Sequence, residues 1–133
     1  MEYICHKRFK GIGASGKEYL IRRKEKLQSV GRFISLGAEA VCVPSSENAY
    51  KYFARNDDGN GLRRGELTYR IAYSPRHPNK DNGFRFTDAE VEMLETEYAH
   101  FLRQDTDTLI FNYGFFNAEI EELEELAKRL EVI

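Results

Sequence analysis

The chain has 133 residues, of which 41% are hydrophobic and 32% are charged, and its formal net charge is −2. This length suits one domain that folds without a disulfide or a metal, and the composition is far from that of a disordered chain. No apolar run could span a bilayer, and the first residues lack the apolar stretch of a signal peptide. We therefore expect a single cytoplasmic domain over residues 1–133 that makes no membrane contact.

The charge is distributed unevenly along the chain. Residues 1–35 contain 9 Lys and Arg against 3 acidic residues, and residues 36–85 contain 8 against 6. Residues 86–133 reverse the balance, with 3 Lys and Arg against 13 acidic residues. Such a chain presents a basic face and an acidic face to partners, or uses both faces only for solvation. The sequence leaves both alternatives open.

The first 44 residues predict three or four short strands of mainly antiparallel order. The expected strands cover residues 2–9, 19–21, 30–36 and 40–43. The last of these is the most apolar, so we expect it at the centre of the sheet, and Pro44 ends it. Residues 17–27 also fit a short helix, which is the alternative to the second strand.

From residue 45 onward the pattern is mainly helical. Ser45 or Ser46 can cap a helix over 47–56, and the segment 57–61, which contains two glycines, stops it. A second helix is expected from residue 62 or 64 to residue 73. A polar loop bounded by prolines follows over 74–83.

Two further helices are predicted in the last third of the chain. Thr87 and Glu90 have the spacing of a capping box, which predicts a helix over 88–103. Asn117 is expected to cap the last helix, whose apolar stripe includes Leu123 and Leu130. The resulting fold class is α+β, with a small N-terminal antiparallel sheet (residues 1–44) packed against about four C-terminal α-helices (residues 45–133).

The segment from Gly11 to Lys17 fits two phosphate-loop patterns, G-x-x-x-x-G-K and G-x-G-x-x-G. A nucleotide-hydrolysing loop needs Ser or Thr after the lysine to hold Mg²⁺, but that residue here is Glu18. The preceding residues are charged, whereas a buried parallel strand is apolar. The pattern therefore favours a turn between strands, with simple anion binding as the alternative. That alternative would use Gly13, Ser15, Gly16 and Lys17.

A second motif, residues 56–61, is similar to a calcium-binding loop. Asn56, Asp58 and Asn60 stand at the first, third and fifth loop positions, but the twelfth is Leu67, where calcium requires a bidentate Glu. A helix stop, in which Asp side chains accept hydrogen bonds from nearby backbone N–H groups, fits the residues better.

No catalytic or metal-binding pattern is present. Cys5 and Cys42 lie in apolar, strand-like segments and are expected to be buried free thiols, with a disulfide between them as the alternative. His6, His77 and His100 lie in three different predicted elements, and only a meeting of Cys42 with His6 in space remains open as a catalytic pair. We therefore expect no enzyme activity, no metal and no cofactor.

Basic and aromatic residues alternate near the N-terminus, which is typical of nucleic-acid binding because cations contact phosphates and bases stack on aromatic rings. This segment contains Tyr3, His6, Lys7, Arg8, Phe9 and Lys10, and further cations follow at Arg22, Arg23, Lys24, Lys26 and Arg32. The acidic C-terminal part suggests the opposite role, since a row of carboxylates can imitate the phosphates of a nucleic acid. Solvated protein surface is the alternative for both parts.

Several segments together resemble small uncharacterised proteins encoded by phages and integrative mobile elements of Gram-positive gut bacteria (Firmicutes). The segments are residues 3–5, 7–10, 46–49, 52–62, 64–65, 67–68, 115–118 and 120–121. The central one is the most specific of them. Accessory proteins of mobile elements often bind and block host factors, including nucleases and defence signalling systems, so the resemblance implies a partner of that kind.

The resulting prediction is a non-enzymatic binding protein of a mobile element that antagonises a host defence factor by protein–protein contact. The alternative is a protein that binds nucleic acid or a nucleotide signal through its N-terminal cations and its central arginines. The candidate binding residues are Lys7, Arg8, Lys10, Arg55, Asn56, Asp57, Asp58, Asn60, Arg63 and Arg64.

Overall fold

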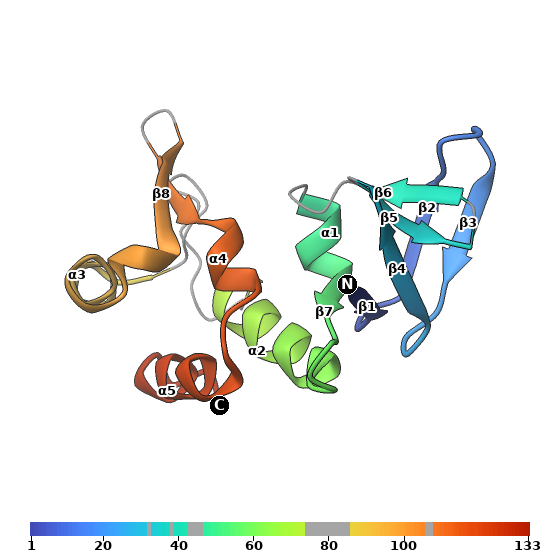
Figure 1. Cartoon of the computed structure of the whole chain (residues 1–133). Coiled ribbons are helices and arrows are strands. Elements are labelled where there is room, and N and C mark those ends of the chain that lie inside the picture. Colours follow the sequence, from blue (N-terminus) through green and yellow to red (C-terminus); the bar gives the residue numbers. More distant parts are fainter. Residues whose placement is uncertain (32, 38, 43–46, 74–85, 106–107) are drawn as a thin grey trace. The chain divides into compact units, whose positions relative to one another are not determined.

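The computed structural model describes residues 1–31, 33–37, 39–42, 47–73, 86–105 and 108–133. Residues 1–66 and 67–133 form two compact units. Strands dominate residues 1–55 and α-helices dominate residues 61–133, which confirms the α+β class (Figure 1). The folding of both units as the one domain expected from the sequence stays a prediction. Across these described ranges, no helix has the length and apolar character needed to cross a membrane.

A five-stranded antiparallel sheet forms the centre of the N-terminal unit, in the order β6-β5-β4-β1-β7. Its strands are β1 (Glu2–Cys5), β4 (Lys26–Val30), β5 (Phe33–Leu36), β6 (Glu39–Cys42) and β7 (Phe53–Arg55). In β1, Tyr3 lies opposite Leu27 of β4, and Cys5 lies opposite Phe53 of β7. The last strand of the sheet in sequence, β7, therefore pairs with the first, β1, although about 50 residues of chain separate them.

A separate hairpin, β2 (Phe9–Ile12) and β3 (Glu18–Ile21), is inserted between β1 and β4. Phe9 lies opposite Ile21, and both side chains are buried. The tip closes through a hydrogen bond from the Gly16 N–H to the Gly13 carbonyl oxygen, at 2.9 Å. Gly16 has a φ of +84°, which is the left-handed region where a glycine is needed.

The strands differ from the sequence prediction in number and in place. The described part of residues 1–44 contains six strands rather than three or four, because 2–9 and 30–36 each divide into two elements at a connection. The seventh strand, β7, lies in a segment predicted to be helical. The helix considered for 17–27 is wrong, since those residues form β3, a turn and the start of β4. The strand expected at the centre of the sheet is β6, which lies at its edge.

Helix α1 (Glu47–Tyr52) is shorter than predicted, and the chain passes directly from it into β7 (Figure 1). The prediction of a helix to residue 56 is wrong because Phe53 to Arg55 pair with β1, an interaction between distant parts of the chain. The proposed caps Ser45 and Ser46 lie outside the described residues, as does the loop predicted over 74–83.

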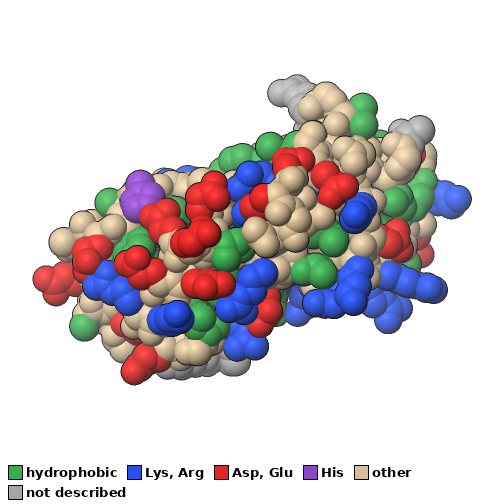
Figure 2. Space-filling view, turned by 60° about the horizontal axis from the view of Figure 1, so that its bottom comes forward, with side chains coloured by type: hydrophobic (Ala, Val, Ile, Leu, Met, Phe, Trp, Pro, Cys, Tyr) green, Lys and Arg blue, Asp and Glu red, His purple; other side chains and the backbone are tan. Residues whose placement is uncertain are grey.

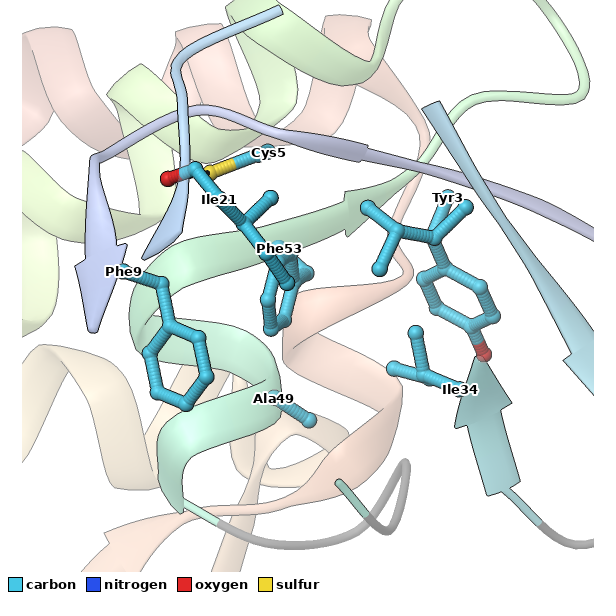
Figure 3. Packing of buried hydrophobic residues seen from close by; sticks show 8 residues of the cluster. Tyr3, Cys5, Phe9, Ile21, Ile34, Ala49 and Phe53 are labelled. Atoms are coloured by element: carbon cyan, nitrogen blue, oxygen red, sulfur yellow. Dashed lines mark hydrogen bonds between the residues drawn. The ribbon is translucent and has the colours of Figure 1, made fainter. Parts of the chain in front are cut away.

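The hydrophobic core of the N-terminal unit joins the sheet, the hairpin and α1 (Figure 3). It contains Tyr3, Cys5, Phe9, Ile21, Leu27, Ile34, Ala49 and Phe53. The ring of Phe9 lies 5.0 Å from that of Tyr52 and 5.3 Å from that of Phe53, in tilted and edge-on arrangements. Such aromatic pairs stabilise the core beyond their buried area.

Helix α2 (Gly61–Tyr73) confirms the predicted second helix, with Leu67 and Ile71 buried. The turn before it contains Gly59, whose φ of +77° confirms the predicted helix stop as a tight turn. Gly65 allows the helix to approach the connection between β1 and β2, because a Cβ at this position would collide with the ring of His6.

The C-terminal unit contains α3 (Asp88–Glu97), α4 (Tyr113–Phe116), α5 (Ile120–Arg129) and the hairpin of β8 (Leu102–Asp105) with β9 (Thr108–Phe111). Helix α3 starts with the predicted capping box, in which the Glu90 N–H donates to Thr87 Oγ1 and the Thr87 N–H donates to Glu90 Oε1. The core is aromatic, and the rings of Phe111 and Phe115 stack at 4.1 Å.

Two boundaries in this unit differ from the prediction. The helix expected over 88–103 ends at Glu97, since a 3-10 turn (Ala99–Phe101) and the β8–β9 hairpin follow. Asn117 does not cap the last helix: it follows the end of α4, and Glu119 stands at the N-terminus of α5. Four aromatic residues here, Phe111, Tyr113, Phe115 and Phe116, are expected in the core from the sequence. The three phenylalanines are buried there, but the prediction is wrong for Tyr113, which is 44% exposed.

Candidate functional site

Seven exposed cationic side chains occupy two connections of the N-terminal unit and the strand residues beside them. We call this group the basic surface, and it consists of Lys7, Arg8, Lys10, Arg22, Arg23, Lys24 and Lys26. The Cys5 N–H donates to the Glu25 carbonyl oxygen at 2.9 Å, and the Lys24 N–H donates to the Cys5 carbonyl oxygen at 2.7 Å. These two bonds hold the β1–β2 connection beside the β3–β4 turn, so cations distant in sequence lie together.

Hydrogen bonds within the β3–β4 turn hold the backbone that carries three of these cations, Arg22, Arg23 and Lys24. The Glu25 N–H donates to the Arg22 carbonyl oxygen at 3.1 Å, and the Arg22 N–H donates to Glu25 Oε1 at 3.2 Å. The carboxylate of Glu25 thus bonds to the backbone of the turn. Lys24 has a φ of +80°, which strains a non-glycine residue and lets the turn reverse within few residues.

Most cations of the basic surface have no carboxylate partner among the described residues. Within the part of the chain that the structure describes, no ion pair involves Arg8, Lys10 or the four cations on the β3–β4 turn and the start of β4. Figure 2 shows Lys and Arg side chains gathered over the N-terminal strands, and acidic side chains gathered over the C-terminal helices. Residues 1–66 contain 13 Lys and Arg against 8 acidic residues, whereas residues 67–133 contain 7 against 14.

The aromatic residues that alternate with these cations in sequence point into the core, whereas the cations point into solvent. Tyr3 and Phe9 are each only 5% exposed and belong to the core cluster, where Figure 3 shows them. His6 is half-buried, and its ring lies against Gly65 of α2. The surface therefore presents cations without the stacking rings that the sequence suggested.

The central candidate residues form a different kind of structure, built around Arg64. This side chain is completely buried, and its Nη2 lies 2.6 Å from Asp58 Oδ2 while its Nη1 donates to the Arg55 carbonyl oxygen at 2.6 Å. The hydrogen bonds from Arg64 are the main cause that holds the pKa of Asp58 well below its ordinary value. Arg64 thus links the end of β7, the turn and α2.

Asn56 and Asp57 attach the same turn to the start of β1. The Asn56 side chain accepts from the Gly61 N–H at 2.8 Å and donates to Glu2 Oε2 at 2.7 Å. Asp57 Oδ1 accepts from the Glu2 N–H at 2.7 Å. Asn60, which is exposed, donates its backbone N–H to Asp58 Oδ1 at 3.0 Å. This arrangement agrees with the predicted helix stop held by side-chain oxygens.

The calcium alternative gains no support from this geometry. The carboxylate of Asp58 faces the guanidinium of Arg64, and the side-chain oxygen of Asn56 accepts a backbone N–H. No group of three or more His, Cys, Asp or Glu side chains within the described ranges could hold a metal ion. Arg63, the remaining central candidate, is partly exposed and lies 3.4 Å from Glu66 within its own helix.

The glycine-rich segment 11–17 is the hairpin tip between β2 and β3, as predicted. The side chain of Glu39 in β6 binds the backbone of this tip, since Glu39 Oε1 accepts from the Ser15 N–H at 2.7 Å. This bond from the Ser15 backbone is the main cause that lowers the pKa of Glu39. A carboxylate therefore stands where the alternative hypothesis would place a bound anion.

The thiol and imidazole groups do not form a catalytic arrangement among the described side chains. Cys5 is a buried free thiol, as predicted, and burial raises its pKa to about 11, which keeps it protonated and unreactive. His100 Nε2 lies 2.6 Å from Glu122 Oε1 in the C-terminal unit. His77 and the side chain of Cys42 lie outside the described part of the chain.

The acidic C-terminal unit shows paired charges. Arg129 binds Glu97 with both guanidinium nitrogens, at 2.5 and 2.8 Å, and Tyr98 Oη donates to Glu125 at 2.8 Å. A shallow groove of about 290 Å³ runs along α3 and is lined by Asp88, Val91, Glu92, Glu95 and Thr96. Its carboxylates face outward on one side of a single helix.

Comparison with known proteins found no relative of this chain. No family model, no curated protein and no solved structure matches the chain.

The structure thus divides the predicted binding residues into two groups. It places Lys7, Arg8 and Lys10 on the basic surface. It places the other seven between the end of β7 and the start of α2: Arg55 in β7, Asn56, Asp57, Asp58 and Asn60 in the turn, and Arg63 and Arg64 in α2. The predicted set omitted the cations of the β3–β4 turn, although their run in sequence is the signal that identifies them. Their closeness to Lys7 depends on strand pairing, which the sequence alone does not reveal.

Proposed function

We propose that this chain is a non-catalytic, cytoplasmic protein that binds nucleic acid through the basic surface of its N-terminal unit. The observation that carries the proposal is a group of exposed cations, most of them without an ion-pair partner in the described chain, held together by two connections of the sheet. Nucleic acids carry a regular array of phosphates, and Lys and Arg that neutralise them gain affinity by releasing counterions. The central arginines contribute less to this proposal, because Arg64 is buried and bound to Asp58.

The test is a binding titration of a fluorescein-labelled oligonucleotide by fluorescence anisotropy at low salt. The variant Arg22→Gln/Arg23→Gln removes two cations of the basic surface, and we expect it to bind at least about 10-fold more weakly. The matched control is Arg103→Gln/Lys128→Gln, which removes two exposed cations of the C-terminal unit and the same net charge. Equal weakening by both variants would show that only net charge matters, and no binding by the wild type would refute the proposal.

A second candidate is the predicted antagonism of a host defence factor by protein–protein contact. The groove along α3 favours it, since three outward-facing carboxylates there could meet a basic surface on a partner. The variant Glu92→Gln/Glu95→Gln would then release a partner captured from host lysate, while Arg22→Gln/Arg23→Gln would retain it. The reverse pattern would support the nucleic-acid proposal instead.

A further inference from the structure

We infer that the preferred ligand of the basic surface is duplex nucleic acid, held by its phosphates without reading of the base sequence. This inference rests on the proposed function and names the class of nucleic acid. It follows from three features of the surface: which side chains are exposed, which are buried, and how firmly the cations are positioned.

The exposed side chains are those that contact phosphates. Lys and Arg are the common partners of phosphate oxygens, and a duplex offers about one negative charge per 1.7 Å of its axis from two strands. The cations of the basic surface lie on two adjoining connections, since Cys5 bonds to both Lys24 and Glu25. The cations are spread across two connections. The two phosphate backbones of a duplex match this arrangement better than the one backbone of a single strand does.

The aromatic side chains on which the bases of single-stranded nucleic acid would stack are buried in this unit. Proteins that bind single strands stack successive bases on exposed aromatic rings. Here Tyr3 and Phe9 are buried in the core, and the chain has no Trp. Leu20, which lies opposite Lys10 in the hairpin, is exposed but has no ring to stack on a base. The exposed Phe33 lies opposite Val30, at the other end of β4 from Lys26.

The positioning of the cations is set by the backbone and does not need the ligand. Two backbone bonds from Cys5 and the closed turn from Arg22 to Glu25 hold the connections. A preformed surface suits a stiff ligand such as a duplex, because neither partner then loses much conformational freedom on binding. Contacts to phosphates position a duplex but carry no sequence information.

The experiment compares a labelled duplex of about 20 base pairs with one of its single strands, by anisotropy between 50 and 200 mM KCl. If about five cations contact phosphates, log Kd should change with log salt with a slope of about 4.5, or about 500-fold over this range. We expect the duplex to bind at least about 10-fold more tightly than the single strand, and a second duplex of different sequence to bind within about 3-fold of the first. Arg22→Gln/Arg23→Gln should lower the slope by about 2, whereas Arg103→Gln/Lys128→Gln should leave it unchanged.

The outcomes separate this inference from the proposed function. Tighter binding of the single strand, with the weakening by Arg22→Gln/Arg23→Gln retained, would overturn the inference and leave the proposed function in place. A difference of more than about 10-fold between the two duplexes would overturn the claim of sequence-independent binding, because that discrimination requires contacts to bases. Binding of neither ligand would refute both.

Discussion

The two units of this chain use charged side chains in opposite ways. In the C-terminal unit, exposed polar and charged side chains pair with each other on the surface, as Arg129 pairs with Glu97 and His100 with Glu122. In the N-terminal unit six of the seven cations of the basic surface have no such partner among the described residues, and the pair of Arg64 with Asp58 joins a fully buried guanidinium to a partly exposed carboxylate. The comparison teaches that net charge alone does not locate a binding surface, since what matters is whether a charge already has a partner.

The largest expected effect comes from the carboxylate that pairs with the buried Arg64. Asp58→Ala should reduce the free energy of unfolding by about 3 kcal/mol, because it leaves the guanidinium of Arg64 buried without its counter-charge. Urea unfolding followed by circular dichroism measures this loss. Asp57→Ala is the control: it removes one exposed hydrogen bond to the Glu2 N–H and should cost no more than about 1 kcal/mol. Equal losses would mean that Arg64 finds another partner.

The same pair predicts how stability depends on pH. Because hydrogen bonds from Arg64 depress the pKa of Asp58 in the folded protein, its contribution to stability is complete above the ordinary Asp pKa of about 3.9. The contribution is lost as the pH falls below that value toward the folded pKa. The wild type should therefore lose its advantage over Asp58→Asn between about pH 5 and pH 2. A constant difference across that range would contradict the role given to Asp58. The pKa of Glu97 is also lowered, but Glu97 is present in both the wild type and Asp58→Asn, so its effect cancels in the difference between their free energies of unfolding.

Local signals in the sequence predicted much of the helical structure. The capping box at Thr87 and the glycine turn before α2 were both confirmed, since each depends on residues a few positions apart. The helix predicted through residue 56 was wrong because β7 exists only by pairing with β1. The position of β6 at the sheet edge likewise depends on the order of strands, which is a property of the whole unit.

The candidate site was predictable only in part for the same reason. The run of cations in residues 1–35 indicated a basic face, but strand pairing decides that Lys7 and Lys24 lie together. Alternation of aromatic and basic residues suggested stacking, yet alternation in a strand sends Phe9 inward and Lys10 outward. The burial of Arg64 could not be inferred from its charge, because a buried Arg is unusual and requires a partner from the fold.

A smaller effect should separate the backbone role of Lys24 from its charge. Lys24→Gly removes the strain of a positive φ and should raise the free energy of unfolding by up to about 1 kcal/mol. The same variant removes one phosphate contact and should lower the salt slope of duplex binding by about 1. The comparison variant Lys26→Gln, at an ordinary strand position, should lower the slope equally without any gain in stability. A gain in both variants would point to relief of charge repulsion in place of backbone strain.

The smallest effect is expected at the surface pair of the C-terminal unit. Arg129→Gln removes the paired hydrogen bonds to Glu97 and the contact of the guanidinium with the Tyr98 ring, at 5.6 Å. Because the pair is exposed, Tm should fall by only a few degrees, and the fall should shrink in 0.5 M NaCl as the charges are screened. Arg22→Gln/Arg23→Gln should leave Tm unchanged or slightly higher, since those cations have like charges as neighbours. If neutralising the basic surface lowered Tm as much as Arg129→Gln does, its cations would serve folding, and the contrast between the two units would fail.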